Sequence, residues 1–172
     1  DEKVPYTYVS GTRGSPSTTQ AASLATFQHE FGIAMSDYML RRYRNAQTTL
    51  EKIAPVLSDL QKDLPEKEYA GLLSEYLFYG GVSQLALARS KHAELSDSQR
   101  VQHLEQAVVL LSRADSLAQK HHLPEAEREA YFLGIAYGFS GKHREAVEQL
   151  RQVPSTSAYY SYSTKLIARW TP

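Results

Sequence analysis

Residues 130–154 read AYFLGIAYGFSGKHREAVEQLRQVP, and this stretch decides the fold. Two runs rich in small and apolar residues lie on either side of Gly141, a residue that favours a turn. Gly134 and Ala146 are small where the two helices of a hairpin would touch, and Leu150 would fill the space beside them. The stretch therefore predicts two antiparallel helices joined by a tight turn.

The rest of the chain from about residue 20 is rich in Ala, Leu, Gln, Glu, Lys and Arg, the straight-chain helix formers. Pro65 and Pro124 each precede Glu-rich first turns, as is typical of helix starts. Ser96 and Gln99 have the spacing of a capping box, and Thr156 or Ser157 would cap the last helix. Seven helices are predicted, near 20–40, 43–62, 66–91, 98–121, 125–139, 143–152 and 157–169.

The second-helix pattern of the hairpin returns twice upstream. Three copies with one spacing indicate an internal repeat. The full stretch 130–154 resembles the tetratricopeptide repeat, and the positions that carry the resemblance are Leu133-Gly134, Tyr137, Gly141, Glu145-Ala146, Leu150, Val153 and Pro154. The matching positions upstream are Gln106-Ala107, Leu111 and Ala114, and Asn45-Ala46, Leu50 and Ile53. For the first helices we take Tyr76, Tyr79 and Gly80 in the middle copy, and Phe31, Gly32, Ile33 and Ala34 in the first, which then has two extra residues between its helices.

The resemblance implies an all-α fold, a right-handed superhelix of antiparallel helical hairpins. About three repeats are expected, near 25–55, 70–118 and 127–154. A capping helix near 157–170 would cover the open end, as terminal elements of such stacks must. Residues 1–19, which show no helical period, are expected to form an extended N-terminal arm or linker beside a helical domain over 20–172.

Composition excludes several classes of function. The chain has 172 residues with 19 Lys and Arg against 19 Asp and Glu, so its net charge is zero, and it has no cysteine. Because phosphate binding needs surplus clustered cations, we expect no nucleic-acid partner. Without cysteine there are no disulfides, thiolate metal sites or cysteine nucleophiles. No apolar run is long enough to span a membrane, and we expect a soluble piece, processed or trimmed at its start.

No catalytic motif is found, so an enzyme is not expected. His121 and His122 are adjacent and would point about 100° apart on a helix, which argues against a shared metal ion. The other histidines have no paired ligand at helical spacing, and we expect neither a metal nor a cofactor. The dense basic run Arg41-Arg42-Tyr43-Arg44 has two interpretations, a solvated turn or a contact with an acidic partner.

Repeats of this family usually bind a peptide on the concave wall lined by the first helix of each hairpin. Because the Lys and Asn set that clamps a C-terminal carboxylate in some members is absent, we expect an apolar or aromatic ligand segment. The resemblance places a partner-binding groove at Phe31, Met35, Tyr38, Leu77, Gln84, Arg128, Tyr131, Ile135 and Phe139.

The sequence thus predicts a non-enzymatic adaptor or scaffold that binds a protein or peptide partner. The alternative is a structural piece that forms homo-oligomers through its N-terminal arm or its C-terminal helix. Lack of cysteine and many Gln, Ser and Tyr residues fit a bacterial envelope or periplasmic protein, and a cytoplasmic protein would look much the same.

Overall fold

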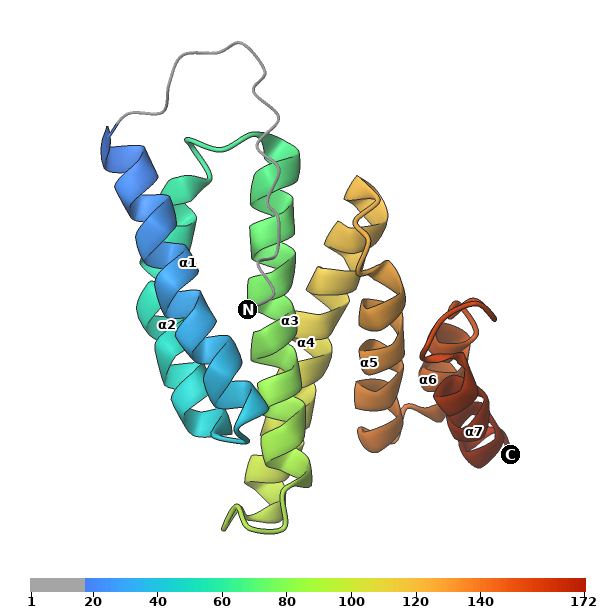
Figure 1. Cartoon of the computed structure of the whole chain (residues 1–172). Helices are drawn as coiled ribbons and strands as arrows, with labels where there is room; N and C mark the ends of the chain where they lie inside the picture. The colour runs from blue at the N-terminus through green and yellow to red at the C-terminus, as the bar shows by residue number, and fades with distance from the viewer. Residues whose placement is uncertain (1–17) are drawn as a thin grey trace.

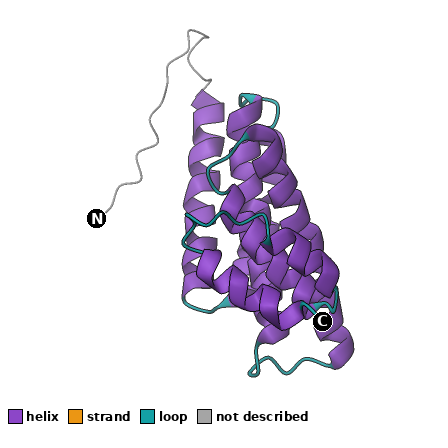
Figure 2. Cartoon of the chain, turned by 90° about the vertical axis from the view of Figure 1, so that its right-hand side faces the viewer, coloured by secondary structure: helices purple, strands orange, loops and turns teal. Residues whose placement is uncertain are grey.

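The chain is all-helical over the part that its computed structural model describes, residues 18–172, with side chains described from Ala21 (Figure 1, Figure 2). This range contains seven α-helices and no strand, which confirms the all-α prediction. The arm predicted for residues 1–19 lies outside the described residues, except that positions 18 and 19 begin the first helix. The helices are α1 Thr18–Met39, α2 Tyr43–Leu60, α3 Glu66–Arg89, α4 Asp97–His121, α5 Ala126–Phe139, α6 His143–Leu150 and α7 Tyr160–Trp170.

Local signals set most helix ends. The Ser96 hydroxyl accepts from the Gln99 amide at 3.2 Å, and the Gln99 side chain accepts from the Ser96 amide at 2.8 Å, so the predicted capping box is confirmed. The start of α7 differs from the prediction. It begins at Tyr160 without a side-chain cap, because Ser157 instead accepts a hydrogen bond from the Tyr159 amide within the preceding turn.

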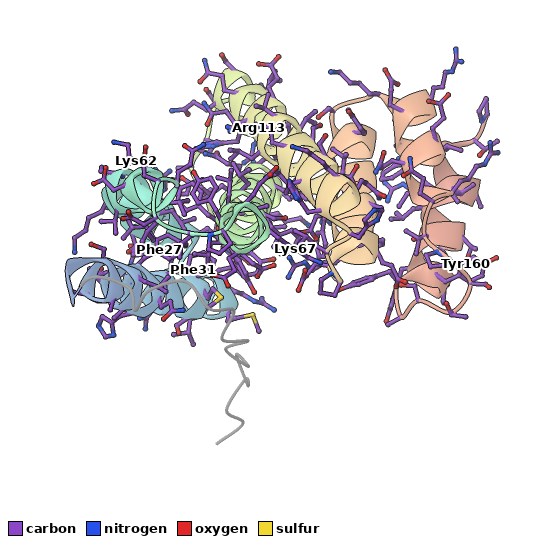
Figure 3. All side chains as sticks on the ribbon, turned by 90° about the horizontal axis from the view of Figure 1, so that it is seen from above. Phe27, Phe31, Lys62, Lys67, Arg113 and Tyr160 are labelled. Atoms are coloured by element: carbon purple, nitrogen blue, oxygen red, sulfur yellow. The ribbon has the colours of Figure 1, made fainter. Side chains whose placement is uncertain are left out.

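Helices that are neighbours in the chain pack side by side, and they follow one another across the molecule in Figure 1. Among the described helices, every packed pair is adjacent in the chain or one helix apart. One core cluster joins α1, α2 and α3, a second joins α3, α4 and α5, and a third seats α7 on α5 and α6. Figure 3 shows Phe27 and Phe31 pointing from α1 into the first cluster.

Small residues let paired helices approach closely. A Cβ added to Gly134 would lie 2.6 Å from Leu150 of α6, so the predicted close contact at Gly134 is confirmed. In α3 the equivalent residue is Gly81, whose added Cβ would lie 2.6 Å from Leu111 of α4. The sequence-based choice of Gly80 is therefore wrong by one position, because Gly80 meets Leu110 only at ordinary contact distance.

The α1–α2 and α5–α6 turns share one backbone conformation. Arg41 and Gly141 both have positive φ, 62° and 78°. The next residues, Arg42 and Lys142, have φ and ψ of −89° and 58° and of −87° and 64°. The first hairpin therefore has no extra residues between its helices, which corrects the predicted spacing.

The first hairpin's close-contact position follows from this shared turn. Ala34 stands where Gly134 stands in the later hairpin and is fully buried. Gly32, chosen from the sequence, has open space where its Cβ would be. The register of the first helix therefore shifts by two residues relative to the sequence-based alignment.

Candidate binding surface

Three of the predicted groove residues belong to the core. Phe31, Leu77 and Ile135 are only 7%, 2% and 7% exposed. Phe31 packs in the α1–α3 cluster, and the other two pack in the α3–α5 cluster. These three side chains are enclosed by neighbouring helices and offer little surface to a ligand, which corrects their placement on a binding wall.

Gln84 faces the partner helix of its own hairpin. Its Nε2 donates to Gln106 Oε1 at 3.2 Å, and its Oε1 contacts the His103 ring nitrogen Nδ1; both partners are on α4. This half-buried side chain therefore joins α3 to α4. Burial, with a smaller contribution from Arg44, lowers the pKa of His103.

The other predicted aromatic and apolar residues remain partly accessible. Met35 packs at the edge of the α1–α3 cluster. Tyr38 and Tyr131 are half-buried. Phe139 lies edge-to-face on Trp170, with ring centroids 5.9 Å apart, and the Arg89 guanidinium lies 4.2 Å above the Phe139 ring.

A continuous series of aromatic rings begins at the start of α2, crosses α1, α3 and α5, and reaches the segment before α7. We call it the aromatic row: Tyr43, Tyr38, Tyr79, Phe78, Phe132, Tyr131 and Tyr159. Successive ring centroids are 4.8 to 5.7 Å apart, within the range of favourable ring pairs. All but the buried Phe78 are half-buried, so the row leaves aromatic surface in contact with solvent.

Hydroxyl groups gather along this row. Burial is the largest cause of the raised pKa of Tyr38, Tyr79 and Tyr131, and the Tyr159 hydroxyl contributes to the rise in all three. These four hydroxyls come from three helices and a loop, and each can donate a hydrogen bond. Sequence reasoning missed Tyr79, Phe132 and Tyr159 as members of one surface, since only the packing brings them together.

Arg128, also predicted in the groove, lies over the Phe78 ring of the row in a partly buried ion cluster. Its guanidinium is 3.7 Å above the Phe78 ring, and it donates to both oxygens of Glu129, at 2.8 and 2.9 Å, and to Glu75. Ser74 donates to Glu129 at 3.5 Å. Burial alone would lower the pKa of Arg128. The hydrogen bonds that Arg128 donates to Glu129 and Glu75 outweigh burial and hold that pKa above its usual value. The charge of Arg128 is thus neutralised within the chain.

Glu129 makes the stability of the chain depend on pH. It is fully buried, and burial raises its pKa from 4.5 to about 7 although Arg128 acts to lower it. The folded chain binds the Glu129 proton more tightly than the unfolded chain does. Proton binding therefore stabilises the fold, fully below pH 4.5, and this stabilisation is lost as pH rises toward 7. We expect this residue to lower the free energy of unfolding by at most about 3 kcal/mol across that interval.

Urea unfolding at pH 5 and at pH 7.5, compared between the natural chain and Glu129→Gln, measures this effect. The variant cannot titrate at position 129, so its stability should change less between the two pH values. Glu148→Gln, on an exposed residue of α6, is the control and should keep the full pH dependence. Equal pH dependence in all three proteins would contradict the assignment.

A pocket of about 760 Å³ opens next to the aromatic row. Three members of the row, Tyr38, Tyr43 and Phe132, line it, together with the α1–α2 turn, the start of α2, the end of α3 and the α3–α4 loop. Among the described residues, the charged side chains that line it are all Lys or Arg, and we call these five residues the cation pocket: Arg41, Arg42, Arg44, Arg89 and Lys91.

The α3–α4 loop that carries Lys91 is fixed by an arginine of α4. Arg100 donates to the carbonyl oxygens of Ala88, Ser90 and Ala93 at 2.8, 3.1 and 3.2 Å. The loop over residues 90–96 is therefore fixed in place, and it contributes one wall of the pocket.

The histidines are dispersed over the described part of the chain. His143 stacks on Trp170, His121 approaches Glu66 at 3.8 Å, and His122 ends α4 with a positive φ. Within residues 18–172, no three His, Asp or Glu side chains are grouped as a metal ion would require.

Comparison with protein-family models, curated proteins and solved structures finds no match to this chain. None of the helices in the described range combines the length and the apolar character that crossing a bilayer requires. The geometry of the site is therefore the basis for a functional proposal.

Proposed function

We propose that this chain is a non-enzymatic protein-interaction module that binds a peptide or helix of a partner along the aromatic row. In this proposal its hairpins are tetratricopeptide-like repeats stacked into a right-handed superhelix. The matching Gly81–Leu111 and Gly134–Leu150 contacts and the shared turn conformation support this assignment. In it, α1, α3 and α5 line the concave wall and α7 caps the end.

The observation that carries the proposal is the aromatic row itself. Tyrosine supplies a large apolar area with a polar tip and loses little conformational entropy on binding, which favours it at protein interfaces. The rings already support one another, as the stacked pair Tyr131 and Tyr159 at 4.8 Å illustrates, so little ordering is left for the ligand to induce. A preformed surface of this kind suits an extended or helical segment with apolar or aromatic side chains.

A peptide library displayed on phage and selected on the immobilised full chain tests this proposal. The affinity of the selected peptides is then measured for the natural chain and for Tyr131→Ala/Tyr159→Ala. We expect the double variant to bind at least about tenfold more weakly, because two adjoining rings of the row are lost. Circular dichroism checks that helicity is kept.

Tyr160→Ala is the matched control, since Tyr160 is 41% exposed on α7 and has no ring contact with the row. It should bind like the natural chain. A library that yields no binder, or equal affinity in the double variant and the control, would overturn the proposal.

Self-assembly is the second candidate function, favoured by Tyr162, which is 59% exposed on the terminal helix. Light scattering on the same proteins separates the two functions. A stable oligomer that is lost in Tyr162→Ala, together with no peptide binding, would favour self-assembly.

A further inference from the structure

The cation pocket has a charge that its own surroundings do not neutralise. Five of the chain's 19 Lys and Arg residues line it, and no Asp or Glu within residues 18–172 does. Asp37 approaches Arg42 at 3.8 Å from outside the lining. Within the described residues, Arg41, Arg44 and Lys91 have no ion pair.

Helix dipoles do not account for this cluster. The ends of α1 and α3 reach the pocket, and each carries about half a negative charge, far less than five positive ones. Arg42 and Arg44 lie at the start of α2, the positive end of a helix, where cations are unfavourable. Helix α2 also has no side-chain cap, so its first backbone N–H groups are available to an anion at the same place.

Arg41 adds a backbone cost to the same site. Its φ of 62° is a left-handed conformation that favours glycine, and the matching turn between α5 and α6 has Gly141 there. The arginine therefore holds this backbone conformation at a cost that a glycine would avoid.

We propose that the cation pocket binds side-chain carboxylates of an acidic segment of a partner protein, whose neighbouring aromatic or apolar residues lie on the aromatic row. This inference rests on the proposed function and names the class of partner. Tyr38, Tyr43 and Phe132 belong to both surfaces, so one ligand can occupy both.

The distribution of charge favours a peptide over a nucleic acid. A nucleic-acid backbone needs cations along its whole path, and Arg128, which stacks on the middle of the row, is already neutralised by Glu75 and Glu129. Five cations are gathered around one pocket instead of along a path, and the chain as a whole is neutral. A ligand with carboxylates at one end and rings along the rest fits this arrangement.

Three fluorescent peptides with blocked ends test the proposal. They share two tyrosines and one phenylalanine and differ at four positions, which are Glu, Gln or Lys. We expect the Glu peptide to bind the full chain at least about tenfold more tightly than the Gln peptide, with an affinity that falls as salt rises. A single-stranded oligonucleotide of equal charge is the fourth probe and should bind more weakly than the Glu peptide.

Charge-reversal variants test whether the carboxylates of the Glu peptide bind in the cation pocket. Arg41→Glu/Arg44→Glu/Lys91→Glu changes three exposed residues of the pocket and should remove the preference for the Glu peptide. The matched control is Lys62→Glu/Lys67→Glu/Arg113→Glu, which makes the same change at exposed residues outside the pocket, labelled in Figure 3, and should keep the preference.

The outcomes separate the two proposals. If Tyr131→Ala/Tyr159→Ala weakens all three peptides but the Glu and Gln peptides bind equally, the acidic ligand is wrong and the interaction module stands. If the pocket variant and the control lose the preference to the same degree, the location is wrong. Tighter binding of the oligonucleotide would overturn the peptide assignment, and no binding of any probe together with an unproductive library would overturn both.

Discussion

Arg128→Ala is expected to lower the free energy of unfolding by about 3 to 5 kcal/mol at pH 7.5. The substitution leaves the carboxylate of Glu129 fully buried with only the 3.5 Å bond from Ser74, and it removes the cation over Phe78. Breaking one side of a buried ion pair costs far more than the pair contributes, because the remaining charge has lost its compensation. Urea unfolding followed by circular dichroism measures the loss.

Two further variants test this explanation. Arg144→Ala breaks an exposed pair with Glu148 on α6 and should change stability by no more than about 0.5 kcal/mol. Arg128→Ala/Glu129→Gln removes both charges and should recover part of the loss. The loss in Arg128→Ala should also shrink at pH 5, where Glu129 is protonated. A loss that is the same at both pH values and in the double variant would point to packing alone.

Trp170→Ala is expected to weaken the docking of α7 by about 3 to 4 kcal/mol. The indole, 7% exposed, fills the space that the missing side chain of Gly138 leaves on α5, where an added Cβ would lie 2.2 Å from the ring. It also contacts Phe139 and stacks on His143, so one side chain joins α7 to both helices of the preceding hairpin.

Hydrogen exchange resolved along the chain measures this docking. The α7 amides should lose at least about a hundredfold of their protection, since every 1.4 kcal/mol is a factor of ten, whereas α1 and α2 amides should not change. Tyr162→Ala, at a residue of the same helix that is 59% exposed, is the control and should keep α7 protected. Unchanged protection in Trp170→Ala would show that α7 is held by other contacts.

The helices could be predicted from the sequence because their ends depend on local signals. Pro65 and the capping box of Ser96 and Gln99 act within one turn of chain, and the bounds they imply agree with α3 and α4 to within one or two residues. The start of α7 lacked such a signal. Ser157 looks like a cap in the sequence, but its hydroxyl stabilises a turn three residues earlier.

Register and surface could not be predicted in the same way. Gly80 and Gly81 are neighbours, and only the contact with Leu111 decides which one faces α4. Phe31 and Leu77 are apolar residues on helices that contact more than one other helix. Their apolar character alone does not show whether they face the core or the predicted binding wall. The cation pocket joins Arg41 to Lys91, which lie on different hairpins, and no local pattern relates them.

Each described helix packs only on helices that are adjacent in the chain or one helix away, and this has a consequence for folding. Contacts between segments that are close in sequence require little loop closure, so each can form before distant parts of the chain arrive. Phe27 can be enclosed by α2 and α3 while α5 is still being synthesised. Folding can thus proceed during translation, one hairpin at a time, and each folded hairpin provides the surface on which the next one packs.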